Sequence, residues 1–91
     1  MEATKFKLYT EDKNGALLDG VIAEEKIDCF TTYYVSGSWL GAKEPSIIVE
    51  AITVDASSMR AIFRRLAEII KVMNEQDCVL VTEEKITADF I

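Results

Sequence analysis

The stretch from Asp55 to Asn74 carries the clearest structural pattern in this sequence. Apolar residues recur there at the three- and four-residue intervals of one helical face, and charged residues fill the other face. The apolar stripe consists of Met59, Ile62, Phe63, Leu66, Ile69, Ile70 and Met73. Either Asp55 or Ser57 is placed to cap the first turn. We therefore expect a helix that covers one face of a sheet.

Strand-like segments lie on both sides of this helix. Residues 5–10 alternate apolar and polar side chains, and residues 27–38 are rich in Thr, Tyr, Phe and Val. Residues 46–54 and 77–82 are largely apolar and are expected to be the remaining core strands. A shorter helical pattern covers residues 16–26, with Asn14 as its predicted cap.

The resulting order is β-α-β-β-α-β within a single domain, residues 1–91. This order predicts an α+β, ferredoxin-like fold, in which two helices cover one face of a four-stranded antiparallel sheet. Glu83 to Lys85 is interpreted as a polar break, after which residues 86–91 are a possible extra C-terminal edge strand.

The predicted strands are apolar on both faces, although only one face would be covered by helices. Because a contiguous apolar face is a hazard on a monomer, we expect a homodimer or a larger homo-oligomer that packs sheet faces or edges together. Glu50 interrupts this apolar pattern. It is expected either to pair with Lys7 or an arginine, or to serve as a ligand or catalytic carboxylate.

Composition excludes several classes of function. The net charge is −6, from 16 acidic and 10 basic residues, which disfavours direct nucleic-acid binding. The sequence has no histidine, no P-loop and no glycine-rich dinucleotide motif, so we predict no metal site, no cofactor and no imidazole-based catalysis. Cys29 and Cys78 are expected to be reduced thiols in core strands. No signal peptide or membrane span is evident, which favours a cytoplasmic location.

Residues 37–45 are interpreted as a loop joining the two middle strands, and they contain the only Trp, two glycines and the only Pro. Tyr33, Tyr34, Trp39 and Glu44 can form a pocket there, or the loop can simply fold back on its own sheet. Arg60, Arg64 and Arg65 share one helix and can grip an anion, or they can form an ordinary solvated face.

The segment from Phe30 to Val81 resembles a group of small bacterial and phage proteins of unknown activity. The features that carry the resemblance are the aromatic strand, the run Gly37-Ser-Trp39-Leu-Gly41-Ala-Lys-Glu44-Pro-Ser46, an apolar strand, an amphipathic helix, and Asn74-Glu-Gln76 leading into CVLVT. The resemblance implies a ferredoxin-like domain often carried on mobile elements, and it carries over no activity to particular residues.

Three functional hypotheses follow. The first is a non-enzymatic oligomeric binding protein that acts on a host protein such as a defence factor. The resemblance implies that such a protein is encoded by a phage. The second is a small-ligand binder that sequesters an anionic nucleotide signal at a subunit interface, between the Trp39 loop and the arginines of a neighbour. The third is a small enzyme that uses a Glu/Tyr site containing Glu44 or Glu50.

Overall fold

A computed structural model describes residues 1–27 and 29–91, together with all their side chains except those of Ala16 and Trp39. Its elements are β1 (Glu2–Glu11), α1 (Gly15–Glu24), β2 (Thr31–Trp39), β3 (Ala42–Thr53), α2 (Ala56–Met73) and β4 (Leu80–Thr87). The predicted order is confirmed. Asp28, which falls within the strand expected over residues 27–38, lies outside the described residues.

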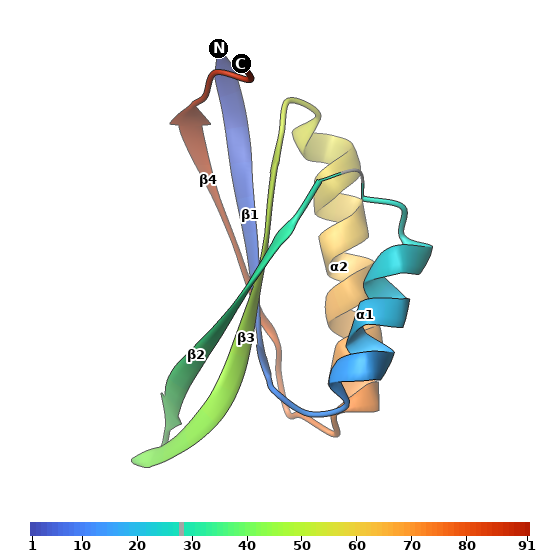
Figure 1. The fold of residues 1–91 in the computed structure, drawn as a ribbon, viewed down its shortest axis with the longest axis vertical. Coiled ribbons are helices and arrows are strands. Elements are labelled where there is room, and N and C mark those ends of the chain that lie inside the picture. Colours follow the sequence, from blue (N-terminus) through green and yellow to red (C-terminus); the bar gives the residue numbers. More distant parts are fainter. Residues whose placement is uncertain (28) are drawn as a thin grey trace.

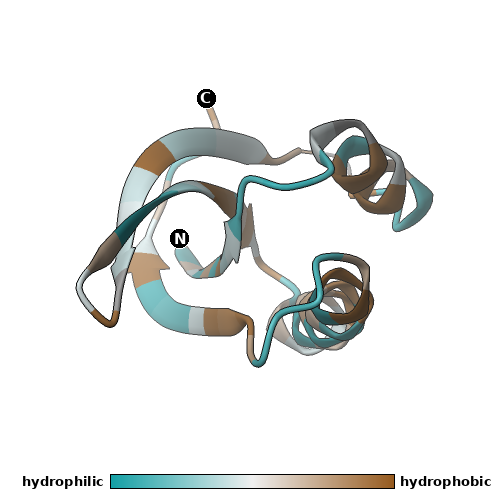
Figure 2. Ribbon diagram, turned by 90° about the horizontal axis from the view of Figure 1, so that it is seen from below, coloured by the Kyte–Doolittle hydropathy of each residue, from teal (hydrophilic) through white to brown (hydrophobic). Residues whose placement is uncertain are grey.

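The four strands form one antiparallel sheet in the order β2-β3-β1-β4. Both helices pack on the same side of this sheet, so the molecule has two layers and one open sheet face (Figure 1). Figure 2, which looks along the strands, shows the sheet on one side and the two helices on the other. The predicted ferredoxin-like arrangement is therefore confirmed.

The core lies between the sheet and the helices. Phe6 and Leu8 project into it from β1, and Phe63 of α2 is in contact with Phe6, with ring centroids 5.5 Å apart. The other buried members are Leu18, Ile22, Ile47, Val49, Ala51, Leu66 and Ile70. Ile69, which the sequence pattern placed in the apolar stripe, is 42% exposed, so that assignment was wrong.

The two helices begin differently. The Asp55 side chain accepts a hydrogen bond from the Ser58 backbone N–H at 3.2 Å, as expected of an N-cap. Asn14 is the N-cap residue of α1, as predicted, but its side chain makes no capping hydrogen bond. Its backbone is left-handed, with φ of 54°, and its side chain donates to the Met73 carbonyl oxygen and the Asn74 Oδ1 instead. Asn14 therefore ties the start of α1 to the end of α2.

The loop predicted over residues 37–45 is a continuation of the two strands. Strand β2 pairs with β3 as far as Trp39 and Ala42, and a two-residue turn of Leu40 and Gly41 joins them. Both turn residues have positive φ, 50° and 84°, which suits the twist of a tight hairpin. Pro45 is tolerated within β3 because its pairing with β1 ends at Ser46, opposite Glu11, so the N–H that proline lacks is not needed there. Its carbonyl oxygen still accepts a hydrogen bond from the Asp12 backbone N–H at 2.9 Å.

The strand boundaries also correct the assignment of the cysteines. Strand β2 begins at Thr31 and β4 begins at Leu80, so Cys29 and Cys78 lie in the connections before these strands and are exposed free thiols. The predicted polar break at 83–85 is instead the middle of β4, where these residues pair with β1. Residues 88–91 form no strand, so the extra edge strand was wrong.

Within the described ranges, the structure has no helix long and apolar enough to cross a membrane.

Candidate functional site

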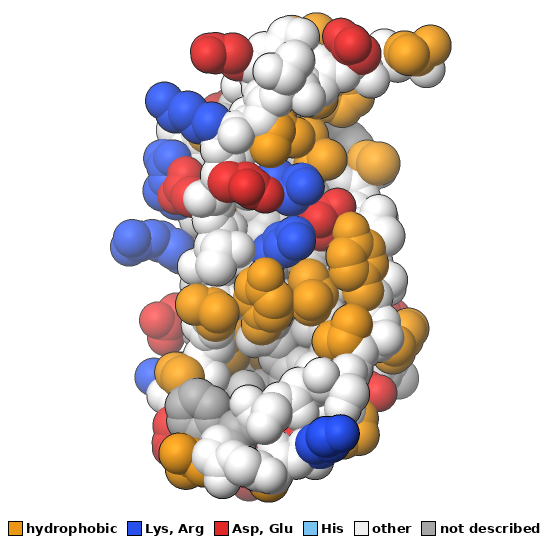
Figure 3. All heavy atoms as spheres, turned by 90° about the vertical axis from the view of Figure 1, so that its left-hand side faces the viewer, with side chains coloured by type: hydrophobic (Ala, Val, Ile, Leu, Met, Phe, Trp, Pro, Cys, Tyr) orange, Lys and Arg blue, Asp and Glu red, His pale blue; other side chains and the backbone are white. Residues whose placement is uncertain are grey.

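An apolar row crosses the open sheet face. Cross-strand pairing aligns Tyr33 with Ile48, Ile48 with Tyr9, and Tyr9 with Leu80, so each strand contributes one residue. The adjacent rows contain the charged pairs Lys7–Glu50 and Lys5–Glu84. Figure 3 shows this face, with hydrophobic side chains in a band next to acidic and basic ones. The predicted apolar character of the second face is therefore present, although charges divide it.

Glu50 is held by neighbours on this face. Its Oε1 lies 3.9 Å from the Lys7 Nζ, and only 14% of its side chain is exposed. The predicted pairing with Lys7 is confirmed. A hydrogen bond with Glu50, together with burial, raises the pKa of the Tyr33 hydroxyl. Glu50 therefore interacts with both Lys7 and Tyr33 on this face.

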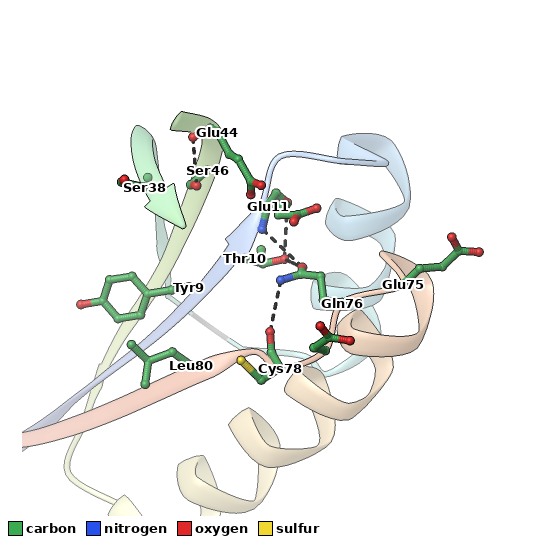
Figure 4. Close-up of a pocket in the computed structure, with 12 residues that line it drawn as sticks. Tyr9, Thr10, Glu11, Ser38, Glu44, Ser46, Glu75, Gln76, Cys78 and Leu80 are labelled. Atoms are coloured by element: carbon green, nitrogen blue, oxygen red, sulfur yellow. Dashed lines mark hydrogen bonds between the residues drawn. The ribbon is translucent and has the colours of Figure 1, made fainter. Parts of the chain in front are cut away.

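A cavity of about 380 Å³ opens at one end of the sheet. Figure 4 shows it between the β2–β3 hairpin, the end of β1 and the segment that leads from α2 into β4. Its lining residues are Tyr9, Thr10, Glu11, Gly37, Ser38, Glu44, Ser46, Glu75, Gln76, Asp77, Cys78 and Leu80. This volume lies within the range of about 300–1,000 Å³ that is common for small-molecule sites.

The cavity lining is strongly acidic. Among the lining residues that the structure describes, four carry carboxylates, Glu11, Glu44, Glu75 and Asp77, and none is Lys or Arg. Tyr9 and Leu80 are cross-strand partners and supply an apolar part of the wall. The site therefore combines a flat apolar surface with negative charge.

Two of these carboxyls, Glu11 and Glu44, influence each other. The Glu44 side chain points toward Glu11 (Figure 4). Burial raises the pKa of Glu44 above its usual value, and the negative charge of Glu11 raises it further. A hydrogen bond from Lys13 lowers the pKa of Glu11, whose Oε2 lies 2.8 Å from the Lys13 Nζ. Glu44 is therefore the more basic carboxyl of the pair.

A buried polar network forms the floor of the cavity. Thr10 and Asn74 are 3% and 2% exposed, and both bind the side-chain oxygen of Gln76. Gln76 also binds the backbone N–H of Glu11 and the carbonyl oxygen of Cys78. These bonds connect the end of β1 to the segment before β4.

Among the predicted site residues whose side chains the structure describes, only Glu44 lines the cavity. Tyr33 lies on the open face beside Glu50, whereas Tyr34 pairs with Ile47 on the helix side and is 73% exposed. Trp39 is the last residue of β2, and its side chain lies outside the described part of the chain. The structure therefore does not bring the two tyrosines and Glu44 into one pocket.

The arginines of α2 lie elsewhere. Arg60 makes a bidentate contact with Glu83 of β4, through Nε at 2.8 Å and Nη2 at 2.7 Å. Arg65 does the same with Glu25, at 3.1 and 2.7 Å. Arg64 is exposed on the same helix. Within one chain, Arg60 and Arg65 are thus engaged by carboxylates, and an anion site that uses a neighbour's arginines stays a prediction.

Sequence reasoning missed most of the cavity. The sequence pattern placed Tyr9 in a strand, Glu11 in a turn, Gln76 at a helix end and Cys78 in the core. The signal that could have indicated them is the polar run Asn74-Glu75-Gln76 directly after an amphipathic helix. In the part of the chain that the structure describes, no cluster of His, Cys, Asp and Glu could hold a metal ion.

No protein-family model and no curated protein sequence matches this chain. Its fold is nevertheless similar to solved structures. A nitrogen regulatory PII-like protein from Thiomonas intermedia K12, bound to ADP, AMP and bicarbonate, has a TM-score of 0.64 at 14% identity, covering 98% of this chain and 97% of that one.

Two other structures of this fold extend the comparison. A PII-like signalling protein from Thermus thermophilus has a TM-score of 0.60 at 17% identity, covering 94% of this chain and 87% of that one. A phage SAM lyase in complex with S-methyl-5′-thioadenosine has a TM-score of 0.60 at 13% identity, covering 98% and 92%. At these identities the similarity establishes the fold, and function must be argued from the site.

Proposed function

We propose that this chain binds a positively charged, adenosine-containing small molecule of the S-adenosylmethionine type in the acidic cavity. The observation that carries the proposal is the lining, with four carboxylates and no basic side chain. A phosphate group there would meet like charge, whereas a sulfonium or ammonium group would be attracted. Tyr9 and Leu80 supply an apolar surface against which a base or ribose can pack.

The similar structures are consistent with an adenosine-containing ligand, since one holds ADP and AMP and another holds S-methyl-5′-thioadenosine. ADP and AMP are anionic, whereas S-methyl-5′-thioadenosine carries no charge. The acidic lining of this chain therefore favours the S-methyl-5′-thioadenosine type of ligand over ADP and AMP. The proposed positively charged ligand therefore differs from the anionic nucleotide that the sequence suggested as a small-molecule ligand.

The same geometry favours a second, enzymatic candidate function, which is cleavage of the bound sulfonium. A carboxylate of raised pKa is a stronger base than an ordinary one, and Glu44 is such a group. In this step the C–S bond breaks and its electron pair stays on sulfur, giving a neutral thioether. Glu44 removes a proton from the carbon next to the one that was bonded to sulfur, and the electron pair of that C–H bond forms the carbon–carbon double bond of the other product.

Isothermal titration calorimetry with three ligands tests the binding proposal. We expect S-adenosylmethionine to bind, its uncharged thioether S-methyl-5′-thioadenosine to bind more weakly, and ADP to bind weakest. Glu44→Gln should weaken S-adenosylmethionine binding about tenfold while changing thioether binding little, because only the first ligand carries the charge that Glu44 attracts.

Glu24→Gln is the matched control, since it removes an exposed carboxylate at the end of α1, away from the cavity lining. Tighter binding of ADP than of S-adenosylmethionine would overturn the proposal. Chromatography of the same mixtures detects the thioether, and its absence after long incubation would exclude the cleavage step.

We also infer that the chain self-associates through the open sheet face, where the apolar row of Tyr33, Ile48, Tyr9 and Leu80 lies. Tyr9 and Leu80 also line the cavity, so the cavity borders this face. Binding of a host protein by the hairpin stays a prediction, supported by the exposure of Tyr34 and of Leu40, which is 91% exposed at the turn.

A further inference from the structure

The Gln76 side-chain amide joins the end of β1 to the connection between α2 and β4. Its Oε1 accepts hydrogen bonds from the Thr10 hydroxyl and from the Glu11 backbone N–H, the latter at 3.3 Å. Its Nε2 donates to the Cys78 carbonyl oxygen, also at 3.3 Å. A backbone N–H can only donate and a backbone carbonyl can only accept, so both ends of the amide are specified.

The Asn74 side chain also binds this amide. Its Nδ2 lies 3.2 Å from the Gln76 Oε1, 3.0 Å from the Thr10 Oγ1 and 3.4 Å from the Glu11 carbonyl oxygen. Because Asn74 and Thr10 are almost fully buried, water cannot substitute for a lost partner without opening the floor. The buried groups of the network therefore depend on one another for their hydrogen bonds.

The residues tied together by Gln76 belong to opposite walls of the cavity. Glu11 stands at the end of β1, and the Glu44 side chain points toward it (Figure 4). Cys78 and Leu80 belong to the segment that enters β4. Gln76 belongs to the same connection as Cys78, and its amide binds the Cys78 backbone and, on the opposite wall, the Glu11 backbone.

We propose that Gln76 is the positioning residue of the acidic cavity, holding the carboxylates of Glu11 and Glu44 at a set separation from the Cys78 wall. This inference rests on the proposed binding function, for which Glu44 is the charged contact. Gln76 acts through the residues it places, and the sequence had assigned it only to a helix end.

Gln76→Met is the test, because it keeps the length of the side chain and removes all of its hydrogen bonds. The walls should separate and admit water, so the dissociation constant for S-adenosylmethionine should rise about tenfold. The titration midpoint of the Glu44 carboxyl, followed by carbon-13 NMR, should fall toward its ordinary value.

Ile22→Val is the matched control. It truncates a core residue of α1 that is not part of the cavity lining, so it lowers stability without touching the cavity. Both the affinity and the Glu44 midpoint should stay unchanged in this variant. If Gln76→Met does not fold, Thr10→Val is used in its place, because it removes one donor to the Gln76 Oε1 with little change of shape. The dissociation constant and the Glu44 midpoint should then change in the same directions but by smaller amounts.

The outcomes separate this inference from the proposed function. If the unmodified protein does not bind S-adenosylmethionine, the proposed function fails, and the Glu44 midpoint alone still tests the role of Gln76. If Gln76→Met loses stability as Ile22→Val does, with an unchanged midpoint, then Gln76 is structural only and the inference is wrong.

Discussion

Arg65 and Glu25 show how single residues join the two helices. Arg65 lies on α2, Glu25 is the C-cap of α1, and their bidentate pair bridges 40 positions of sequence. Only 14% of the Glu25 side chain is exposed. The hydrogen bond from Arg65 lowers the pKa of Glu25 below its usual value. These residues therefore contribute to folding stability in a pH-dependent way.

The pH dependence has a defined sign. Because the pKa of Glu25 is lower in the folded state, its stabilising effect is fully present above the ordinary value of 4.5 and is lost as the pH falls through the folded value. Arg65→Gln should therefore lower the urea midpoint at neutral pH, and its difference from the unmodified protein should vanish in acid.

Arg64→Gln removes a neighbouring exposed charge of the same helix and is the control, with a smaller effect expected at neutral pH. A difference between Arg65→Gln and the unmodified protein that persists unchanged through the acid range would show that Arg65 acts by packing and not through the carboxylate.

At the scale of elements, α2 was the most predictable part of the chain. Its apolar spacing and its cap are local signals, so the interval from 55 to 74 could be read without the rest of the fold. Strand ends are different, because pairing with β1 decides them. Glu83 to Lys85 reads as a break, yet β1 offers partners for all three residues, and they form a strand.

The candidate site was less predictable for the same reason. Its lining comes from β1, β2, β3 and the α2–β4 connection, and no local pattern shows that these meet. Glu44 was identified because it stands in an unusual segment. Glu11 and Gln76 were missed because each, taken alone, is an ordinary polar residue at the end of an element.

The cap of α2 gives a prediction at this scale. Asp55→Ala should lower the free energy of unfolding by about 1 kcal/mol, because the Ser58 backbone N–H loses its acceptor. Urea denaturation measures this loss. Ser57→Ala should have little effect, since the Asp55 side chain and not Ser57 caps the helix. Equal losses in both variants would mean that helix propensity, and not the cap, is responsible.

At the scale of the whole molecule, the sheet is covered on one face and open on the other. The open face carries the apolar row described above, in which Leu80 is exposed and the other three residues are half-buried in a single chain. Burying such a row against a second copy gains hydrophobic free energy, while the flanking charged pairs set the orientation.

Light scattering tests this arrangement. The unmodified protein should have a mass that is a multiple of 10.2 kDa, and Ile48→Lys should reduce it to the single-chain value, because a charge then lies in the middle of the row. Val72→Lys places the same charge on the exposed face of α2 and should leave the assembly intact. A mass of 10.2 kDa for the unmodified protein at high concentration would contradict the proposal.

The two edge strands of the sheet, β4 and β2, differ in charge, and this difference determines where a further strand can pair. Strand β4 contains Glu83, Glu84 and Lys85, and charged residues on an outer strand discourage another strand from pairing there. Strand β2 contains no charged residue over its nine positions. An added strand, whether from another copy or from a peptide, would therefore extend the sheet beside β2, next to the hairpin that forms one wall of the cavity.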